Sequence, residues 1–104
     1  MSKSKRTKAC SISPKVRQEV EERDGHQCIF CKSYQCRGEA HFIGRAQGGL
    51  GIPKNLICVC RNCHRELDNG LNTKRYREIA REYLKSCYPD WNEKDLVYDK
   101  WRME

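Results

Sequence analysis

Two pairs of cysteines, each with the spacing CxxC, carry the strongest chemical signal in this chain of 104 residues. The pairs are Cys28 with Cys31 and Cys60 with Cys63. Each CxxC turn can present two thiolates to one metal ion, and two such turns complete the tetrahedral site typical of structural zinc. A redox CxxC is the competing interpretation, but the paired arrangement in so short a chain favours zinc. Because four thiolates leave no ligand position for water, we expect the zinc to hold the fold and to take no part in a reaction.

The remaining cysteines are interpreted separately. Cys58 and Cys87 stand among apolar residues and are most simply packing residues, whereas Cys36 is a possible substitute zinc ligand and Cys10 has no assigned role. The N-terminus lacks the apolar stretch of a signal peptide, and no apolar run approaches the roughly 20 residues of a membrane span. We therefore expect a cytoplasmic protein without a membrane partner, in which cysteines bind metal rather than form disulfides.

A second set of residues is threaded around the two cysteine pairs. Thirteen residues separate His41 from Asn55, and eight separate Asn55 from His64. Together with the flanking runs RDGHQCIFC, AHFIGRAQGGLGIPKNL and CVCRNCH, this arrangement resembles the HNH nuclease family over about residues 23–68. The run RAQGGLG and the tail DWNEKDLVYDKW are most similar to the small HNH proteins of bacteriophages.

The resemblance implies an α+β fold, a small zinc-stapled ββα-metal (HNH or His-Me finger) domain with flanking helices. In the family, the first His lies on a strand, the Asn on the loop and second strand, and the last His on a helix. His41 would then be the general base, Asn55 would keep His41 oriented, and His64 would bind a catalytic divalent metal. These residue types suit phosphodiester hydrolysis, which needs a base for the attacking water and positive charge at the phosphate.

Asp68 lies four residues after His64, so a helix would place both side chains on one face. An imidazole and a carboxylate can share one cation, and this mixed donor set suits Mg²⁺ or Mn²⁺ while tolerating Ni²⁺ or Zn²⁺. A role at the helix C-terminus, near Asn69 and Gly70, is an equal alternative for Asp68.

The chain departs from the family pattern just before His41. Many members carry a metal-binding His or Asp there, whereas this chain has Ala40, which cannot ligate. Strand alternation would place Glu39 on the same side as His41, as a reserve ligand. The departure predicts weak binding of the catalytic metal in the absence of DNA.

The formal net charge of +7 points to a polyanion as the partner. Arg45, Lys54 and Arg65 are the candidate phosphate contacts, although a basic surface that only maintains solubility is the competing interpretation. The resemblance names double-stranded DNA as the partner, and the likeness to phage proteins adds terminase and portal proteins in DNA packaging, inside the bacterial host cytosol.

Local signals predict the supporting elements. Ser13 and Pro14 predict the start of a helix over residues 15–24, and short strands and loops follow over residues 26–63, including CIFC, EAHFIG and LICVC. Asn72 or Thr73 begins an amphipathic helix that ends before Pro89. Its basic face is either a solvated surface or a surface along DNA phosphates, and it carries Lys74, Arg75, Arg77, Arg81 and Lys85.

The expected organisation is a basic flexible arm over residues 1–12, a nuclease domain over 13–88 and a tail over 89–104 that packs on the domain. We expect an HNH endonuclease that nicks DNA, because one ββα-metal site serves one strand. The alternative is a zinc-stabilised DNA-binding adaptor that has lost catalysis, in keeping with Ala40. An RNA-binding zinc protein is a third possibility, for which we identify no exposed aromatic platform.

Overall fold

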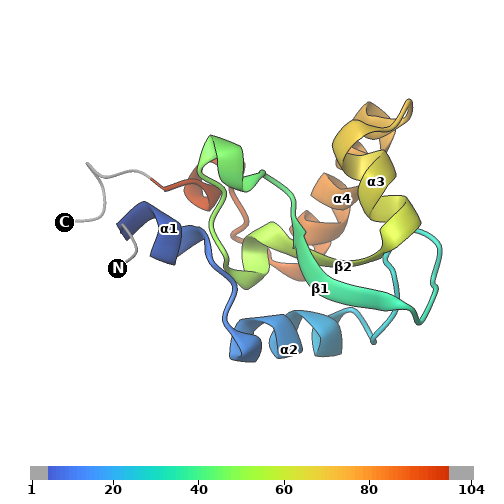
Figure 1. The fold of residues 1–104 in the computed structure, drawn as a ribbon, viewed down its shortest axis with the longest axis horizontal. Helices are drawn as coiled ribbons and strands as arrows, with labels where there is room; N and C mark the ends of the chain where they lie inside the picture. The colour runs from blue at the N-terminus through green and yellow to red at the C-terminus, as the bar shows by residue number, and fades with distance from the viewer. Residues whose placement is uncertain (1–4, 99–104) are drawn as a thin grey trace.

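The computed structural model describes residues 5–98 as a small α+β fold built around a two-stranded antiparallel sheet (Figure 1). Strand β1 (Cys36–His41) pairs with β2 (Leu56–Cys60). Helix α2 lies along one side of this hairpin, and helices α3 and α4 lie on the other side. The α+β class expected from the sequence is therefore confirmed.

The helix boundaries follow local sequence signals. The Ser13 hydroxyl accepts a hydrogen bond from the Val16 N–H, and Pro14 occupies the first turn, so α2 starts where the sequence predicted. None of the helices in residues 5–98 has both the length and the apolar character needed to cross a membrane. The helices are α1 (Lys5–Cys10), α2 (Pro14–Arg23), α3 (Arg61–Asn69) and α4 (Thr73–Cys87), with short 3₁₀ turns η1 (Arg45–Gln47), η2 (Pro53–Asn55) and η3 (Glu93–Leu96).

The segment CIFC, which the sequence placed among short strands and loops, forms the tight turn expected of a metal-binding CxxC pair. The Cys28 N–H donates to the Ser33 carbonyl, and the Lys32 N–H donates to the Cys28 carbonyl, which closes the chain on itself. Strand β1 begins at Cys36, three residues before the segment EAHFIG. Four apolar or cysteine residues in a row do not distinguish a buried strand from a metal-binding turn, and here the turn is formed.

Strand β1 presents one face outward and one face to the protein interior. Arg37, Glu39 and His41 are exposed or half-buried, whereas Gly38 and Ala40 between them are buried. Helix α2 determines which face is buried, because a Cβ at Gly38 would lie 3.0 Å from the Arg17 carbonyl oxygen. The outward face of β1 therefore carries every polar side chain that could act on a ligand at this strand.

Strand β2 is buried on both faces. Ile57 and Val59 belong to the main core together with Leu67 of α3, Leu84 of α4 and Leu96. The alternate residues, Leu56 and Cys58, are equally buried but lie outside that cluster, in keeping with the position of α2 on the other side. A small domain thus uses one strand to join two layers of packing.

A buried ion pair at the end of α2 ties three elements together. The Asp24 carboxylate is fully buried, accepts from Arg23 Nε at 2.7 Å and from the Cys58 N–H at 2.8 Å, and also accepts from the Tyr83 hydroxyl. Arg23 in turn donates to the Leu56 carbonyl at 2.7 Å. Because each polar group has partners, the pair joins α2, β2 and α4 without leaving an unpaired buried charge.

The N-terminal residues differ from the flexible arm that the sequence predicted. Residues Lys5–Cys10 form α1, Cys10 is buried, and the Gly51 N–H donates to the Ala9 carbonyl at 2.9 Å. The close contact between the backbones of Gly51 and the N-terminal segment requires glycine, because a Cβ at Gly51 would lie 2.1 Å from the Ser11 carbonyl oxygen. Residues 1–4 of the predicted arm lie outside the described residues.

Part of the C-terminal tail lies against the domain. Leu96 is fully buried, the Leu50 N–H donates to its carbonyl, and the Trp91 indole donates to the Lys54 carbonyl at 2.7 Å. Residues 99–104 of the expected tail lie outside the described part of the chain.

Candidate functional site

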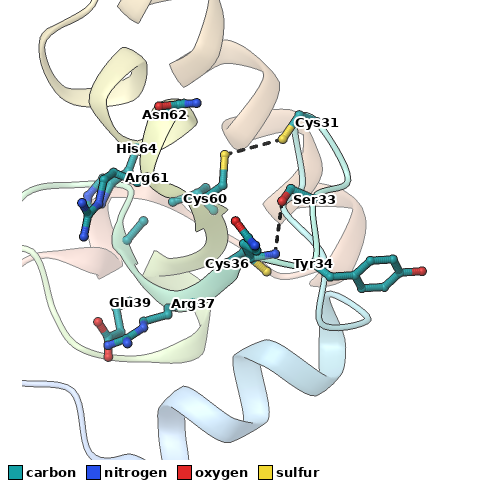
Figure 2. A pocket seen from close by; sticks show the side chains of 13 residues that line it. Cys31, Ser33, Tyr34, Cys36, Arg37, Glu39, Cys60, Arg61, Asn62 and His64 are labelled. Atoms are coloured by element: carbon teal, nitrogen blue, oxygen red, sulfur yellow. Dashed lines mark hydrogen bonds between the residues drawn. The ribbon is translucent and has the colours of Figure 1, made fainter.

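The four paired cysteines lie together at one end of the hairpin, and they could hold a structural metal ion such as zinc. Their sulfur atoms all lie within 4.8 Å of one another. The distance from Cys31 Sγ to Cys60 Sγ is 3.5 Å (Figure 2). Four sulfurs at about 2.3 Å from a tetrahedral zinc would lie about 3.8 Å apart, so the arrangement fits that ion. The cluster contains the four residues predicted from the two CxxC pairs, and we call it the cysteine quartet.

Backbone groups around Cys28 favour its thiolate. Burial acts to raise the pKa of this thiol, but hydrogen bonds from the backbone of Cys31, Cys60 and Phe30 outweigh burial and bring the pKa down to about 7. Thiolate is the form that binds metal, so these backbone groups favour metal binding by Cys28, whereas burial and the neighbouring thiols raise the pKa of Cys63.

Cys60 connects the quartet to the rest of the site. It is the last residue of β2 and the N-cap of α3, where its sulfur accepts from the Cys63 N–H at 3.5 Å. His64 follows in the first turn of α3. The start and direction of α3, and with them the position of His64, are therefore set at the quartet.

Cys36, the possible substitute ligand, lies beside another cysteine instead. The Cys36 sulfur is 2.8 Å from Cys58 Sγ. Among the described residues, neither Cys36 nor Cys58 belongs to the quartet. Cys58 is fully buried, as its apolar neighbours in the sequence suggested, and burial raises the pKa of its thiol, as does the neighbouring Cys36. These two thiols are therefore a pair between β1 and β2.

Three of the predicted site residues meet at one pocket, which we call the histidine pocket. It has a volume of about 610 Å³ and is lined by His41 from β1 and by His64 and Asp68 from α3. His64 Nε2 lies 3.2 Å from Asp68 Oδ2. The pocket is also lined by Ser11, Ile12, Glu39, Gly44 and Arg45.

The histidine pocket offers few metal ligands. Within residues 5–98, the quartet is the one group of three or more His, Cys, Asp or Glu side chains close enough to share an ion. Glu39, expected as a reserve ligand, lines the pocket but forms an ion pair with Arg17 at 3.0 Å. Asp68 is in the last turn of α3, where its carboxylate contacts His64, and the Gly70 N–H at the C-cap bonds the Glu66 carbonyl. The protein would thus supply two side chains, His64 and Asp68, to a cation at this position.

The N-terminal segment selects one tautomer of the neutral His41 ring. Its Nε2 lies 2.9 Å from the Cys10 carbonyl oxygen. A carbonyl can only accept, so Nε2 donates its proton there and the neutral ring keeps a lone pair on Nδ1. Burial lowers the pKa of His41 below 6.5, the Cys10 contact opposes this, and the nearby Arg45 lowers it further. The ring is therefore neutral at pH 7, as a general base must be.

Asn55 holds the loop that follows His41. It is fully buried, and its Oδ1 accepts from the Ile43 N–H at 2.8 Å. Its Nδ2 donates to the Ile43 carbonyl at 3.1 Å and to the Leu50 carbonyl at 2.8 Å. The side chain thus joins the two ends of the segment 43–50, while its backbone carbonyl accepts from the Phe42 N–H. Asn55 fixes the residues next to His41 without touching the imidazole.

The candidate phosphate contacts are spread over the molecule. Arg45 lines the histidine pocket, whereas Arg65 is exposed on α3 outside it. Lys54 forms an ion pair with Asp90 at 2.8 Å and lies over the Tyr88 ring. Of the three, Arg45 is the residue that the structure brings to the site.

Two arginines on α4 are engaged within the protein, which neither interpretation of its basic face anticipated. Arg77 donates to the Phe42 carbonyl at 2.8 Å and lies over the Phe42 ring, 4.8 Å from the ring centre. Arg81 forms an ion pair with Glu93 at 2.9 Å. Arg77 thus stabilises the position of Phe42, and Arg81 joins α4 to η3.

Sequence reasoning missed the part that the N-terminal segment plays in the pocket. The contact between His41 and Cys10 joins residues 31 positions apart, and no local pattern announces it. The glycine at position 51 was the available signal, because glycine permits the close backbone approach that brings this segment in. Comparison of the chain with protein-family models, with curated proteins and with solved structures finds no match.

Proposed function

We propose that this chain is a metal-dependent DNA endonuclease of the HNH type that nicks one strand. The observation that carries the proposal is the meeting of His41, His64 and Asp68 at one pocket, from a strand and a helix far apart in the sequence. A base and a candidate cation site at one open pocket are what phosphodiester hydrolysis requires.

His41 supplies the base. In its neutral form the ring can accept a proton from water on Nδ1, because Nε2 already donates to the Cys10 carbonyl. The same carbonyl then stabilises the positive charge on the protonated ring, since a hydrogen bond to a charged group is stronger than one to a neutral group.

His64 and Asp68 would hold the catalytic cation, with Mg²⁺ or Mn²⁺ suited to their nitrogen and oxygen donors. The cation would supply positive charge to the phosphate and to the departing 3′ oxygen. Two protein ligands make a weak site, and Ala40 before His41 adds none. We therefore expect that the phosphate of DNA is needed for firm binding of the cation.

The cysteine quartet has a separate task in this proposal, which is to hold structural zinc. The proposed context, processing or packaging of phage DNA beside terminase and portal proteins in the cytosol of a bacterial host, rests on the resemblance of the sequence to small phage HNH proteins.

The test is a plasmid nicking assay with the zinc-loaded chain. Supercoiled plasmid should become open circular in the presence of Mg²⁺ or Mn²⁺ before linear DNA appears. Replacement His41→Ala should lower the rate on the order of 10² to 10⁴ fold while zinc content and circular dichroism stay unchanged. His26→Asn is the matched control, because His26 is exposed outside the pocket and asparagine tolerates its left-handed backbone, with φ of 58°.

A chelator must be used with a zinc measurement, because it can remove the structural ion as well as the catalytic ion. Activity that returns with Mg²⁺ alone, at unchanged zinc content, assigns the requirement to the histidine pocket. Cleavage by His41→Ala at the wild-type rate overturns the assignment of the base. A folded, zinc-loaded chain that binds duplex DNA without cutting it would be the DNA-binding adaptor instead.

A further inference from the structure

A second hollow runs from the histidine pocket along the outer face of β1 to the quartet. We call it the knuckle groove; its volume is about 940 Å³. Glu39 and His64 line both hollows, so the two are adjacent. Figure 2 shows the groove between the turn that carries Cys31, strand β1 and the start of α3. A ligand longer than one phosphate could therefore extend from the pocket into the groove.

Two arginines stand in this groove without an acidic partner. Arg37 comes from the outward face of β1, and Arg61 from the first turn of α3; both are exposed. Neither forms an ion pair within residues 5–98, and the one carboxylate that lines the groove, Glu39, is paired with Arg17. Both guanidinium groups extend toward the side of the groove where Glu39 and His64 lie (Figure 2). The groove thus presents two uncompensated positive charges next to the proposed active site.

We propose that the DNA backbone beyond the cleaved phosphate lies in the knuckle groove, where Arg37 and Arg61 bind its phosphates. This inference deepens the proposed function and rests on it for the position of the cleaved bond. Arg37 is four residues before His41 on the same strand face, a separation of about 13 Å. Arg61 is three residues before His64, about one helical turn away.

The spacing suits a polyanion. A strand of duplex DNA carries one charge for about every 3.4 Å along the axis, so phosphates near the cleaved one come within reach of both arginines. An arginine also presents a planar fork of donors that matches phosphate oxygens. We expect these contacts to position the backbone and to be indifferent to base sequence.

The quartet provides the competing role for the same two side chains. Zinc with four thiolates has a formal charge of about −2, and Cys31 and Cys60 line the groove. If the arginines served only to balance that charge, their loss would weaken zinc binding and leave DNA binding unchanged. The experiment therefore measures both.

The measurement uses the full zinc-loaded chain with His41→Ala, so that the DNA stays intact. Binding to a fluorescent duplex is followed by anisotropy over a series of salt concentrations. Arg37→Ala and Arg61→Ala should each reduce the slope of log K against log salt by about 0.9, and the double variant by about twice that. The loss should be equal for two unrelated duplex sequences. Lys15→Ala, which removes an exposed positive charge on α2 outside both hollows, is the control and should leave the slope unchanged.

Unchanged slopes in both groove variants would overturn the proposal, as would an equal change in the Lys15→Ala control. Loss of zinc with an unchanged slope would assign the arginines to the quartet. Lysine at positions 37 and 61 should restore most of the slope, because the charge is retained. DNA binding is measured without cleavage. If the arginine variants lose binding but the wild-type chain never nicks plasmid, the nuclease proposal is overturned and the proposed DNA contact in the groove stands. If the wild-type chain nicks plasmid but the arginine variants bind DNA unchanged, the groove proposal is overturned and the nuclease proposal stands.

Discussion

At the residue scale, a backbone group decides where the proton sits on His41. Catalytic histidines are often oriented by a carboxylate, but the partner here is the carbonyl of Cys10, which has no charge to hold a proton on the ring. Burial and the neighbouring Arg45 both disfavour the charged imidazole, so its pKa falls below 6.5. The neutral form that the proposed base requires is therefore favoured at neutral pH without a carboxylate partner.

This pKa predicts the acid side of the pH profile. The base acts in its neutral form, so the nicking rate should rise with pH through the pKa of His41 and then level off. Because that pKa is lowered, the midpoint of the rise should lie below pH 6.5. Single-turnover nicking between about pH 5 and 8, with zinc content measured at each pH, tests this. A midpoint above pH 6.5 would show that another group limits the reaction.

Asp68 provides a second prediction at this scale. If its carboxylate holds the cation with His64, Asp68→Ala should raise the Mg²⁺ or Mn²⁺ concentration for half-maximal nicking by roughly tenfold or more, since one of two protein ligands is lost. Glu78→Ala, an exposed carboxylate on α4, is the control. An unchanged metal requirement would remove Asp68 from the proposed cation site.

At the scale of elements, the predictable parts of the fold are those fixed by neighbours in the sequence. Helix α2 starts at Ser13 and Pro14 because a cap and a proline act locally, and α4 lies between Asn72 and Pro89 for the same kind of reason. The cysteine quartet was predictable because each CxxC turn is itself local.

The elements that the sequence did not predict depend on distant contacts. Helix α1 packs where it does because Gly51 admits its backbone, and Asp24 is buried because Arg23, Cys58 and Tyr83 surround it. A charged residue at a helix end is ordinarily exposed, so nothing near Asp24 in the sequence marks it as the centre of a buried network. For the same reason the groove beside β1 became visible only with the strand pairing in place.

A single added Cβ atom at position 51 should displace the N-terminal segment from the histidine pocket. Gly51→Ala would place a Cβ 2.1 Å from the Ser11 carbonyl oxygen and 3.1 Å from that of Cys10, so the segment must move. We expect at least a tenfold loss of nicking, retained zinc, and nitrogen NMR shifts of His41 that report a mixture of ring tautomers. Gly25→Asn is the control, because nothing lies within 4 Å of its Cβ position and asparagine tolerates φ of 69°. A wild-type tautomer in Gly51→Ala would contradict the positioning role of Cys10.

At the scale of the whole molecule, the hydrophobic core is small for the number of elements that it must hold. A domain of about 100 residues buries only about two-thirds of its unfolded surface, so additional ties are expected. The described residues provide two such ties, namely the Arg23–Asp24 pair and the cysteine quartet. The quartet is the one whose strength depends on an ion.

We therefore predict one tightly bound zinc per chain, whose removal unfolds the domain. Cys28→Ser should lose zinc and give an insoluble or unfolded protein, because the binding energy of the ion is also folding energy. Cys36→Ser is the matched control: its sulfur lies by Cys58, so zinc and fold should be retained. Metal analysis and thermal unfolding of both variants test this prediction. A stable fold in Cys28→Ser without zinc would show that the fold does not depend on the ion.

The position of Cys60 has a consequence for the life of each new molecule. One residue ends β2, caps α3 and offers a sulfur to the ion, so the uptake of zinc and the completion of the histidine pocket are a single event. A freshly synthesised chain would then remain inert until it acquires the metal, and the number of competent molecules would follow the supply of free zinc rather than the rate of translation. If the chain is the proposed nuclease, it would not cut DNA before metal uptake, and that interval can be timed by mixing the metal-free chain with zinc and plasmid.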